Sequence, residues 1–257
     1  MISCIFSFYI TVFALPGAST PPWTHAAHRQ AGTGDALARA DRLYGDRENL
    51  ASAREAADIW AGRLRDHPDD FDSAWKLARA RYWLGHHAPE RERKALLEQG
   101  LAAARRAAAL EPQRPEGHFW IAANMGALAE SFGLRQGLKY RGAIKDALLT
   151  VLKIDPAFQR GSADRALGRW YFKVPGLFGG SSRKSEEHLR RSLTYHPEST
   201  ISRYFLAETL LGMDRRADAT QELQKVLDAP FDPEWTPEDR EYKAKAQRLL
   251  QTLRQKK

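Results

Sequence analysis

The chain has 257 residues, of which 43% are hydrophobic and 28% charged, and these proportions exclude an intrinsically disordered protein. Ala, Leu and Arg are abundant while Val, Ile and Thr are sparse, which favours helices over strands. The formal net charge is +8, and the excess lies in residues 131–196, with 13 basic and 5 acidic side chains. Such a region can attract an acidic ligand or partner, although a solvated basic face is the simpler interpretation.

The first 18 residues, MISCIFSFYITVFALPGA, contain no charged side chain and lead into small residues. This pattern predicts a signal peptide over residues 1–19 and a periplasmic or otherwise exported protein. The run lacks the basic residues that usually begin a signal peptide. The alternative is a retained N-terminal anchor that associates the protein with a membrane, although the run is short for a membrane span. Residues 20–33, rich in Pro, Thr, Ala and Gly, predict a flexible spacer.

From residue 34 onward, a residue pair that ends in proline follows each apolar, Ala-rich segment. The pairs are separated by 44, 44 and 41 residues: His67-Pro68, Glu111-Pro112, Asp155-Pro156 and His196-Pro197. Proline cannot continue a helix and restricts the residue before it, so each pair marks the end of a helix pair. Repeats of this length predict a solenoid. The predicted units are 34–68, 69–112, 113–156, 157–197 and 198–233, followed by a C-terminal helix that ends the array at residue 257.

Within three of these units, an aromatic residue follows the proline by seven or eight positions and a small residue comes three positions later. The pairs are Trp75 and Ala78, Trp120 and Ala123, and Tyr204 and Ala207. This pattern resembles the tetratricopeptide consensus. It predicts an all-α protein, a tetratricopeptide-like α-solenoid of stacked antiparallel helix pairs. Most tryptophans are then expected to pack between helices, and the first helices of the pairs would line a concave binding groove.

The most specific string in the chain is LGRWYFKVPGLFGGSSRKSEEHLRRSL, residues 167–193. Together with HFWIAANMGALAESFGL before it, this string resembles the T component of the TRAP transporters, a periplasmic tetratricopeptide family. The resemblance implies an accessory that docks a periplasmic solute-binding protein, or that binds a small organic-acid or hydrophobic ligand.

A second family, the regulators of microtubule dynamics, has a comparable leucine-glycine-arginine-tryptophan segment and is the more distant resemblance. It would imply a general protein–protein interaction scaffold instead. The Gly179-Gly180 step and the tail DPEWTPEDREYKAKAQRLL favour the T component.

The candidate groove residues lie in the middle of the array. Asn124 and Arg169 interrupt apolar or small-residue segments, and such polar groups need partners. They are satisfied within the fold, by a backbone carbonyl or by Glu130, or they orient a ligand in the groove beside Trp170 and Tyr171.

The loop that contains Gly179 and Gly180 has two interpretations. A tight connection that uses positive φ is favoured over a mobile lip at a binding cavity.

Catalytic and cofactor motifs are absent from the sequence: there is no HExxH, CxxC, GxSxG or GxxxxGK[ST] pattern. The expectation is a protein that is not an enzyme and that has no cofactor and no metal. The basic residues alternate with apolar helix positions, which argues against nucleic-acid binding. The expected partner is a protein, with a small anionic or hydrophobic ligand and self-association left open.

Overall fold

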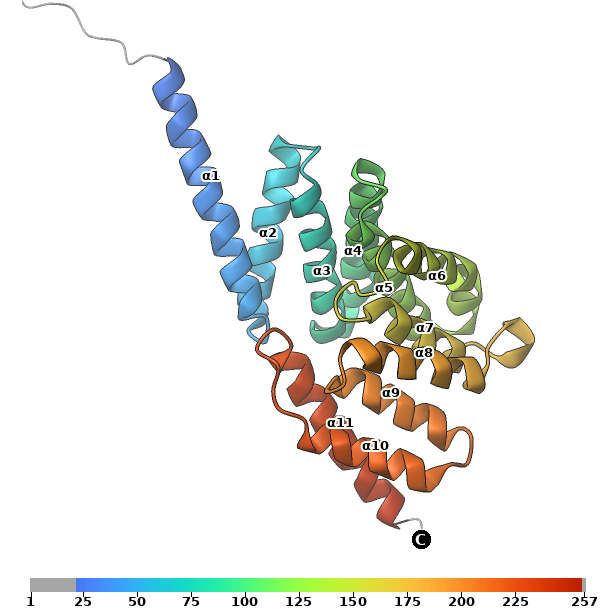
Figure 1. Ribbon diagram of the computed structural model, residues 1–257. Coiled ribbons are helices and arrows are strands. Elements are labelled where there is room, and N and C mark those ends of the chain that lie inside the picture. Colours follow the sequence, from blue (N-terminus) through green and yellow to red (C-terminus); the bar gives the residue numbers. More distant parts are fainter. Residues whose placement is uncertain (1–21, 256–257) are drawn as a thin grey trace, which may run out of the picture. The chain divides into compact units, whose positions relative to one another are not determined.

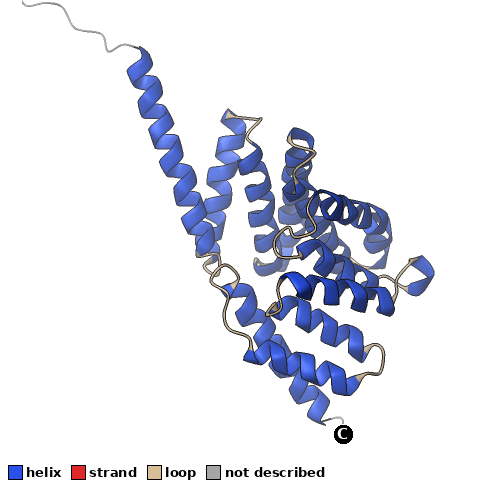
Figure 2. Ribbon diagram, in the orientation of Figure 1, coloured by secondary structure: helices blue, strands red, loops and turns tan. Residues whose placement is uncertain are grey.

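The computed structural model describes the backbone of residues 22–255, and the side chains of residues 34–133 and 137–255. The predicted signal peptide, residues 1–19, lies outside this range. The chain divides into two compact units, residues 1–36 and residues 37–257, and the arrangement described below is that of the second unit. Its described elements are all helices, so the prediction of an all-α repeat fold is confirmed (Figure 2).

The first helix corrects one expectation. Helix α1 spans Pro22–Gly45, so the segment predicted as a flexible spacer, residues 20–33, is helical from Pro22 onward. Proline is well tolerated in the first turn because the N–H that it lacks has no partner there in any helix. The alanines that follow favour the helix and outweigh the glycines that suggested a spacer.

The other helices follow in antiparallel pairs (Figure 1). The elements are α2 (Leu50–Asp66), α3 (Phe71–His87), α4 (Glu90–Leu110), α5 (Pro115–Ser131), α6 (Leu134–Ile154), α7 (Ser162–Lys173), a short 3-10 turn (Gly176–Phe178), α8 (Ser182–Tyr195), α9 (Thr200–Leu211), α10 (Arg216–Asp228) and α11 (Thr236–Gln255). Pro68, Pro112, Pro156 and Pro197 each come two residues after the last residue of a second helix, namely α2, α4, α6 and α8.

Short polar side chains begin several of these helices. Asp70 accepts a hydrogen bond from the N–H of Ser73 at the start of α3 (2.8 Å), and Ser199 accepts one from the N–H of Ser202 at the start of α9 (3.2 Å). These contacts satisfy N–H groups that have no partner within the helix. Each new unit therefore begins soon after the proline that ends the previous one.

The core consists of alanines and large apolar residues at helical spacing. Trp60 is fully buried among alanines of α2, and Trp83, Trp120 and Trp170 are also buried in the apolar clusters between helices. These tryptophans therefore serve packing, as the sequence predicts. Small residues such as Ala78 let neighbouring helices approach closely enough for those rings to fill the space between them.

The array curves toward its first helices. Consecutive first helices contact one another, α3 with α5, α5 with α7, α7 with α9 and α9 with α11. Within the described range, no contact of similar extent joins α4 to α6, α6 to α8, or α8 to α10. Because the first helices lie closer together than the second helices, they form the concave side. We call the surface formed by α3, α5, α7 and α9 the inner face.

Candidate partner-binding face

Arg169, in the middle of α7, lies on the inner face and connects three first helices. Its Nε donates to Glu130 Oε1 of α5 at 3.2 Å, and its Nη1 donates to Glu208 Oε2 of α9 at 2.6 Å. Its guanidinium also lies 4.6 Å from the ring centroid of Phe205. The sequence predicted Glu130 as a partner, but no sequence pattern indicated Glu208. Since 22% of the Arg169 side chain is exposed, solvent and a partner can reach it.

Asn124 of α5 is fully buried, so it cannot line a groove, and its groove assignment is corrected. Its Nδ2 donates to the carbonyl of Trp120 at 2.8 Å and approaches that of Ala78 in α3 at 3.4 Å. The amide therefore joins α5 to α3. Because Gly100 of α4 has no side chain, the Asn124 amide can lie directly against its backbone. Asn124 therefore lies in the core between α3, α4 and α5.

Trp170 and Tyr171 are also core residues, with 8% and 7% exposure. The Trp170 indole donates to the carbonyl of Arg141 in α6 at 2.9 Å, and the two aromatic rings meet edge to face at 4.9 Å. Tyr171 stacks on His188 of α8, with ring centroids 5.3 Å apart. Trp170 packs α7 against α6 and Tyr171 packs it against α8, and neither side chain contributes to an accessible groove.

The loop between α7 and α8 is a tight turn that requires glycine. Gly179 has φ +100°, and a Cβ on Gly180 would lie 1.6 Å from the carbonyl oxygen of Val174. The N–H of Ser181 donates to the carbonyl of Tyr171 at 2.9 Å, which closes the turn. These features support the structural interpretation of the loop. Its tip carries Leu177, which is 91% exposed.

Helix α11 supplies a contribution to the inner face that the sequence analysis missed. The ring of Tyr242 lies 5.4 Å from that of Tyr204 and 5.6 Å from that of Phe205, both on α9. Just before α11, the ring of Trp235 lies 5.4 Å from the guanidinium of Arg165 on α7. This contribution could have been predicted from the sequence, because Trp235, Glu238, Glu241 and Tyr242 follow one another at the three- and four-residue spacing that places side chains on one face of a helix.

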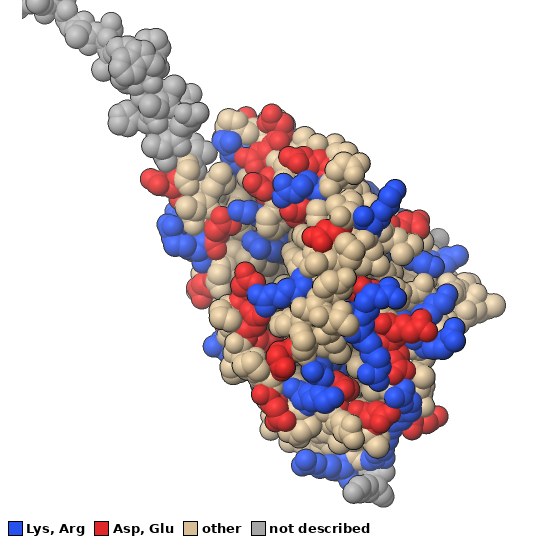
Figure 3. Space-filling view, in the orientation of Figure 1, with Lys and Arg blue, Asp and Glu red and all other residues tan. Residues whose placement is uncertain are grey.

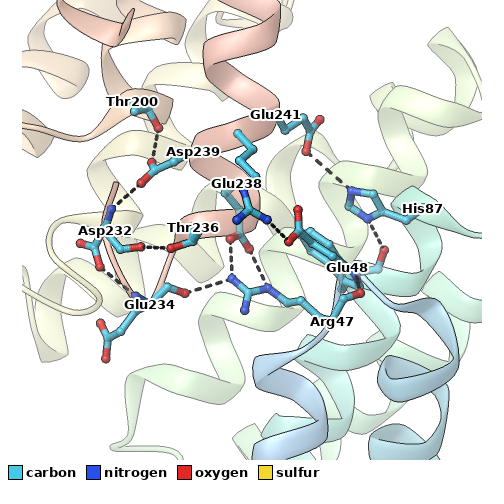
Figure 4. A network of polar contacts seen from close by, with 12 residues as sticks. Arg47, Glu48, His87, Thr200, Asp232, Glu234, Thr236, Glu238, Asp239 and Glu241 are labelled. Atoms are coloured by element: carbon cyan, nitrogen blue, oxygen red, sulfur yellow. Dashed lines mark hydrogen bonds and ion pairs between the residues drawn. The ribbon is translucent and has the colours of Figure 1, made fainter. Parts of the chain in front are cut away.

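A buried ion pair connects the start of α11 to the turn between α1 and α2 (Figure 4). Arg47 donates through Nε to Glu238 Oε1 at 3.2 Å and through Nη2 to the carbonyl of Glu234 at 3.0 Å. Its side chain is 7% exposed, and that of Glu238 is 16% exposed. The Trp83 indole donates to the carbonyl of Arg47 at 2.7 Å, which holds the turn against α3. The two ends of the array are thus joined through residues far apart in sequence.

Two further pairs reinforce this connection (Figure 4). Arg240 pairs with Glu48, and His87 Nε2 at the end of α3 lies 3.6 Å from Glu241 Oε2. The other ring nitrogen of His87 is 2.8 Å from the carbonyl of Trp83. Burial lowers the pKa of His87, but the contacts with Glu241 and this carbonyl outweigh it and raise the pKa above its ordinary value. The contact with His87, together with that of Lys245, lowers the pKa of Glu241 to about 2.

Polar contacts also fix the start of α11 to α9 and to the segment that precedes α11 (Figure 4). Asp239 accepts hydrogen bonds from Thr200 Oγ1 at 2.6 Å and from the N–H of Asp232 at 2.8 Å. Thr236 Oγ1 donates to the carbonyl of Asp232 at 2.8 Å. We call residues 232–242, which carry these contacts, the strap.

Arg165 is a buried cation under the strap. It is 8% exposed, and its guanidinium makes no hydrogen bond or ion pair with any described residue. Burial lowers its pKa, opposed by the nearby Tyr242, Tyr82 and Glu238. Burial likewise raises the pKa of Tyr82 and of Tyr242. The inner face therefore holds a buried positive charge whose guanidinium lies over the ring of Trp235.

The surface charge is mixed. On the face drawn in Figure 3, Lys and Arg alternate with Asp and Glu. Many of these charges form surface pairs, for example Arg190 with Glu186 and Arg54 with Glu92. Among the described side chains, no group of three or more His, Cys, Asp or Glu could hold a metal ion. Within the same range, no helix is long and apolar enough to cross a membrane.

This arrangement of helix pairs defines the class: the protein is a tetratricopeptide-like helical repeat protein. The chain is similar to TTC0263, a thermophilic TPR protein of Thermus thermophilus, with a TM-score of 0.64 and 20% identity over 85% of this chain and 98% of that chain. MamA matches with a TM-score of 0.47 and 15% identity, over 78% of this chain and 96% of that chain. A search of curated proteins found no match.

The family model for regulator of microtubule dynamics protein 1-3 matches residues 36–178, more than half of the chain. The chain belongs to this family. This is the family that the sequence analysis ranked second, and the T-component resemblance that it ranked first receives no support from these matches. The matched region includes Arg47 and Arg169 and ends before the strap.

Proposed function

We propose that the protein is a non-catalytic scaffold that binds a segment of a partner protein on its inner face. The observation that carries this proposal is Arg169, whose charge is placed on the inner face by three first helices and remains partly exposed. A residue that serves only the core would have no reason to be reachable. The tetratricopeptide class and the family membership both favour a scaffold over an enzyme.

The inner face would recognise its partner through an ion pair with Arg169 and through contacts with aromatic rings. An acidic side chain of the partner would replace Glu130 or Glu208 at the Arg169 guanidinium, and an apolar or aromatic side chain would pack beside it on the half-buried ring of Phe205. Because the bound partner would bury the exchanged ion pair, removing Arg169 would leave the partner's carboxylate buried and unpaired, so affinity would depend on the Arg169 charge as well as on the rings.

The test is capture of a partner from an extract of the source cells by the immobilised full-length chain. Arg169→Ala is expected to reduce retention of the specific partner about ten-fold or more. Arg183→Ala is the matched control, because Arg183 has an 81% exposed side chain and only a long contact with Glu187. Circular dichroism checks that both variants fold. Equal retention by the folded Arg169→Ala variant would refute the proposed face.

The accessory role in TRAP-type transport is the second candidate, and the observation that favours it is the basic excess of residues 131–196. The accessory role would require periplasmic or exported localisation, or association with a membrane through an uncleaved leader. N-terminal sequencing of the protein from fractionated cells tests the leader. Binding of a purified solute-binding protein to the full chain tests the accessory role, and co-sedimentation with microtubules tests the activity that the family description names.

A further inference from the structure

We propose that the inner face is a receptor for an acidic, aromatic helical segment of a partner protein, and that the strap occupies this receptor within the same chain. The inference rests on the proposed function and specifies the chemistry of the partner. It also gives the C-terminal segment a role beyond completing the helical array.

The strap and the array make contacts of complementary composition. Apart from Arg240, which pairs with Glu48 of the array, the strap contributes carboxylates and aromatic rings, and the array contributes cations and rings. The four pairs are Trp235 with Arg165, Glu238 with Arg47, Glu241 with His87, and Tyr242 with Phe205. A bound partner segment would need the same two kinds of side chain, about one helical turn apart.

The two halves of α11 are held to the array in different ways. Ala246 and Leu250 in its second half are buried in an apolar cluster with α9 and α10. By contrast, the strap reaches α3 and the turn before α2 through side chains, with no helix packing of comparable extent. Polar side-chain contacts can open one by one, whereas the packed half stays in place. Pro237 and Asp239 of the strap are buried as well, so we expect the strap to leave the inner face by melting the first turns of α11 while the packed half of the helix stays in place.

The strap leaves one charge of the inner face, that of Arg165, without an ion-pair partner. It offers Arg165 the ring of Trp235 but no carboxylate within hydrogen-bonding distance. The cavity beside Arg165 and Trp235 has a volume of about 10 Å³, which is room for one water molecule. A partner with a carboxylate at this position would gain an ion pair that the strap does not make. That difference would let it displace the strap.

A partner that binds the inner face must compete with the strap. Because the strap is part of the same chain, its effective concentration at the inner face is high. Tethered segments compete at roughly millimolar effective concentration. A free peptide with the same contacts should therefore bind the native chain weakly and bind a loosened chain more tightly.

The experiment uses the full-length chain and a fluorescent peptide of residues 232–245 as the probe. Glu238→Gln in the chain removes the carboxylate that pairs with the buried Arg47, and circular dichroism checks that the array stays folded. We expect this variant to bind the peptide about ten-fold more tightly. Glu234→Gln is the matched control, since it removes the same charge from the strap at a side chain that is 72% exposed. This control should change the affinity less than about three-fold. In the Glu238→Gln background, Arg165→Met should reverse the gain.

A covalent lock provides the second arm. Glu48→Cys and Arg240→Cys, combined with Cys4→Ser, place two thiols where an exposed ion pair lies. Bridging them with a bismaleimide should abolish peptide binding, and the unbridged protein should bind. Equal binding by the bridged and unbridged forms, or equal affinities for Glu238→Gln and Glu234→Gln, would overturn the inference. So would peptide-independent dimers of Glu238→Gln in which straps exchange between copies, because the occupant would then be a second copy.

The outcomes separate this inference from the proposed function. Partner capture that depends on Arg169 but is unaffected by the lock would leave the scaffold function standing and overturn the strap's role. Lock-sensitive peptide binding without an Arg169-dependent partner would support the strap and refute the proposed function.

Discussion

Replacing Gly180 by Ala tests whether the loop between α7 and α8 is a rigid connection. A Cβ at this position would lie 1.6 Å from the carbonyl oxygen of Val174, whereas carbon and oxygen normally stay about 3.3 Å apart or more. The turn must therefore open by more than an ångström. That movement would strain the hydrogen bonds from Gly180 N to Pro175 O (3.2 Å) and from Ser181 N to Tyr171 O (2.9 Å).

We expect Gly180→Ala to destabilise the protein by about 2–3 kcal/mol, from steric overlap and at least one weakened hydrogen bond. Gly176→Ala is the control in the same loop, because a Cβ there meets no atom within 4 Å, and its effect should be within about 0.5 kcal/mol of zero. Urea denaturation measures the difference, and hydrogen exchange should show the loss of protection in α7 and α8. If the two variants are equally stable, the loop is pliable and the reasoning is refuted.

Three further predictions concern other parts of the array. Gly100→Ala would place a Cβ 2.3 Å from Oδ1 of the buried Asn124, so urea denaturation should show a loss of about 1–3 kcal/mol. The ion pair of His87 with Glu241 stabilises the folded state fully between pH 4.5 and pH 6.5, the ordinary pKa values of Glu and His. This stabilisation is lost as the pH rises through the raised pKa of His87, because the imidazole then loses its charge. Between about pH 6 and pH 8 the wild type should lose up to about 1 kcal/mol more than His87→Gln, and parallel pH profiles would contradict this. Leu177→Ser should leave the melting temperature unchanged, since the side chain is 91% exposed, and a clear drop would indicate unrecognised packing.

The helix pairs were predictable because their signals are local. Proline after each second helix, a polar side chain at several helix starts, and aromatic and small residues at helical spacing act within one or two turns of the chain. Pro68, Pro112, Pro156 and Pro197 therefore mark helix ends correctly. The segment from Pro22 was assigned wrongly because scattered glycine and proline indicate a loop only when the flanking residues do not favour a helix.

The tertiary structure alone decided which polar and aromatic residues face the interior and which face the binding surface. Asn124, Trp170 and Tyr171 were candidates for the groove as well as for the core, and α3, α6 and α8 bury them. The strap reaches Arg47 across 191 residues of sequence, and no local pattern encodes that contact. The sequence by itself determined the repeat and its boundaries, because these follow from short-range propensities. The curvature that brings the C-terminal helix to the N-terminal turn follows from how the packed helices add up along the array, so only the folded chain reveals it.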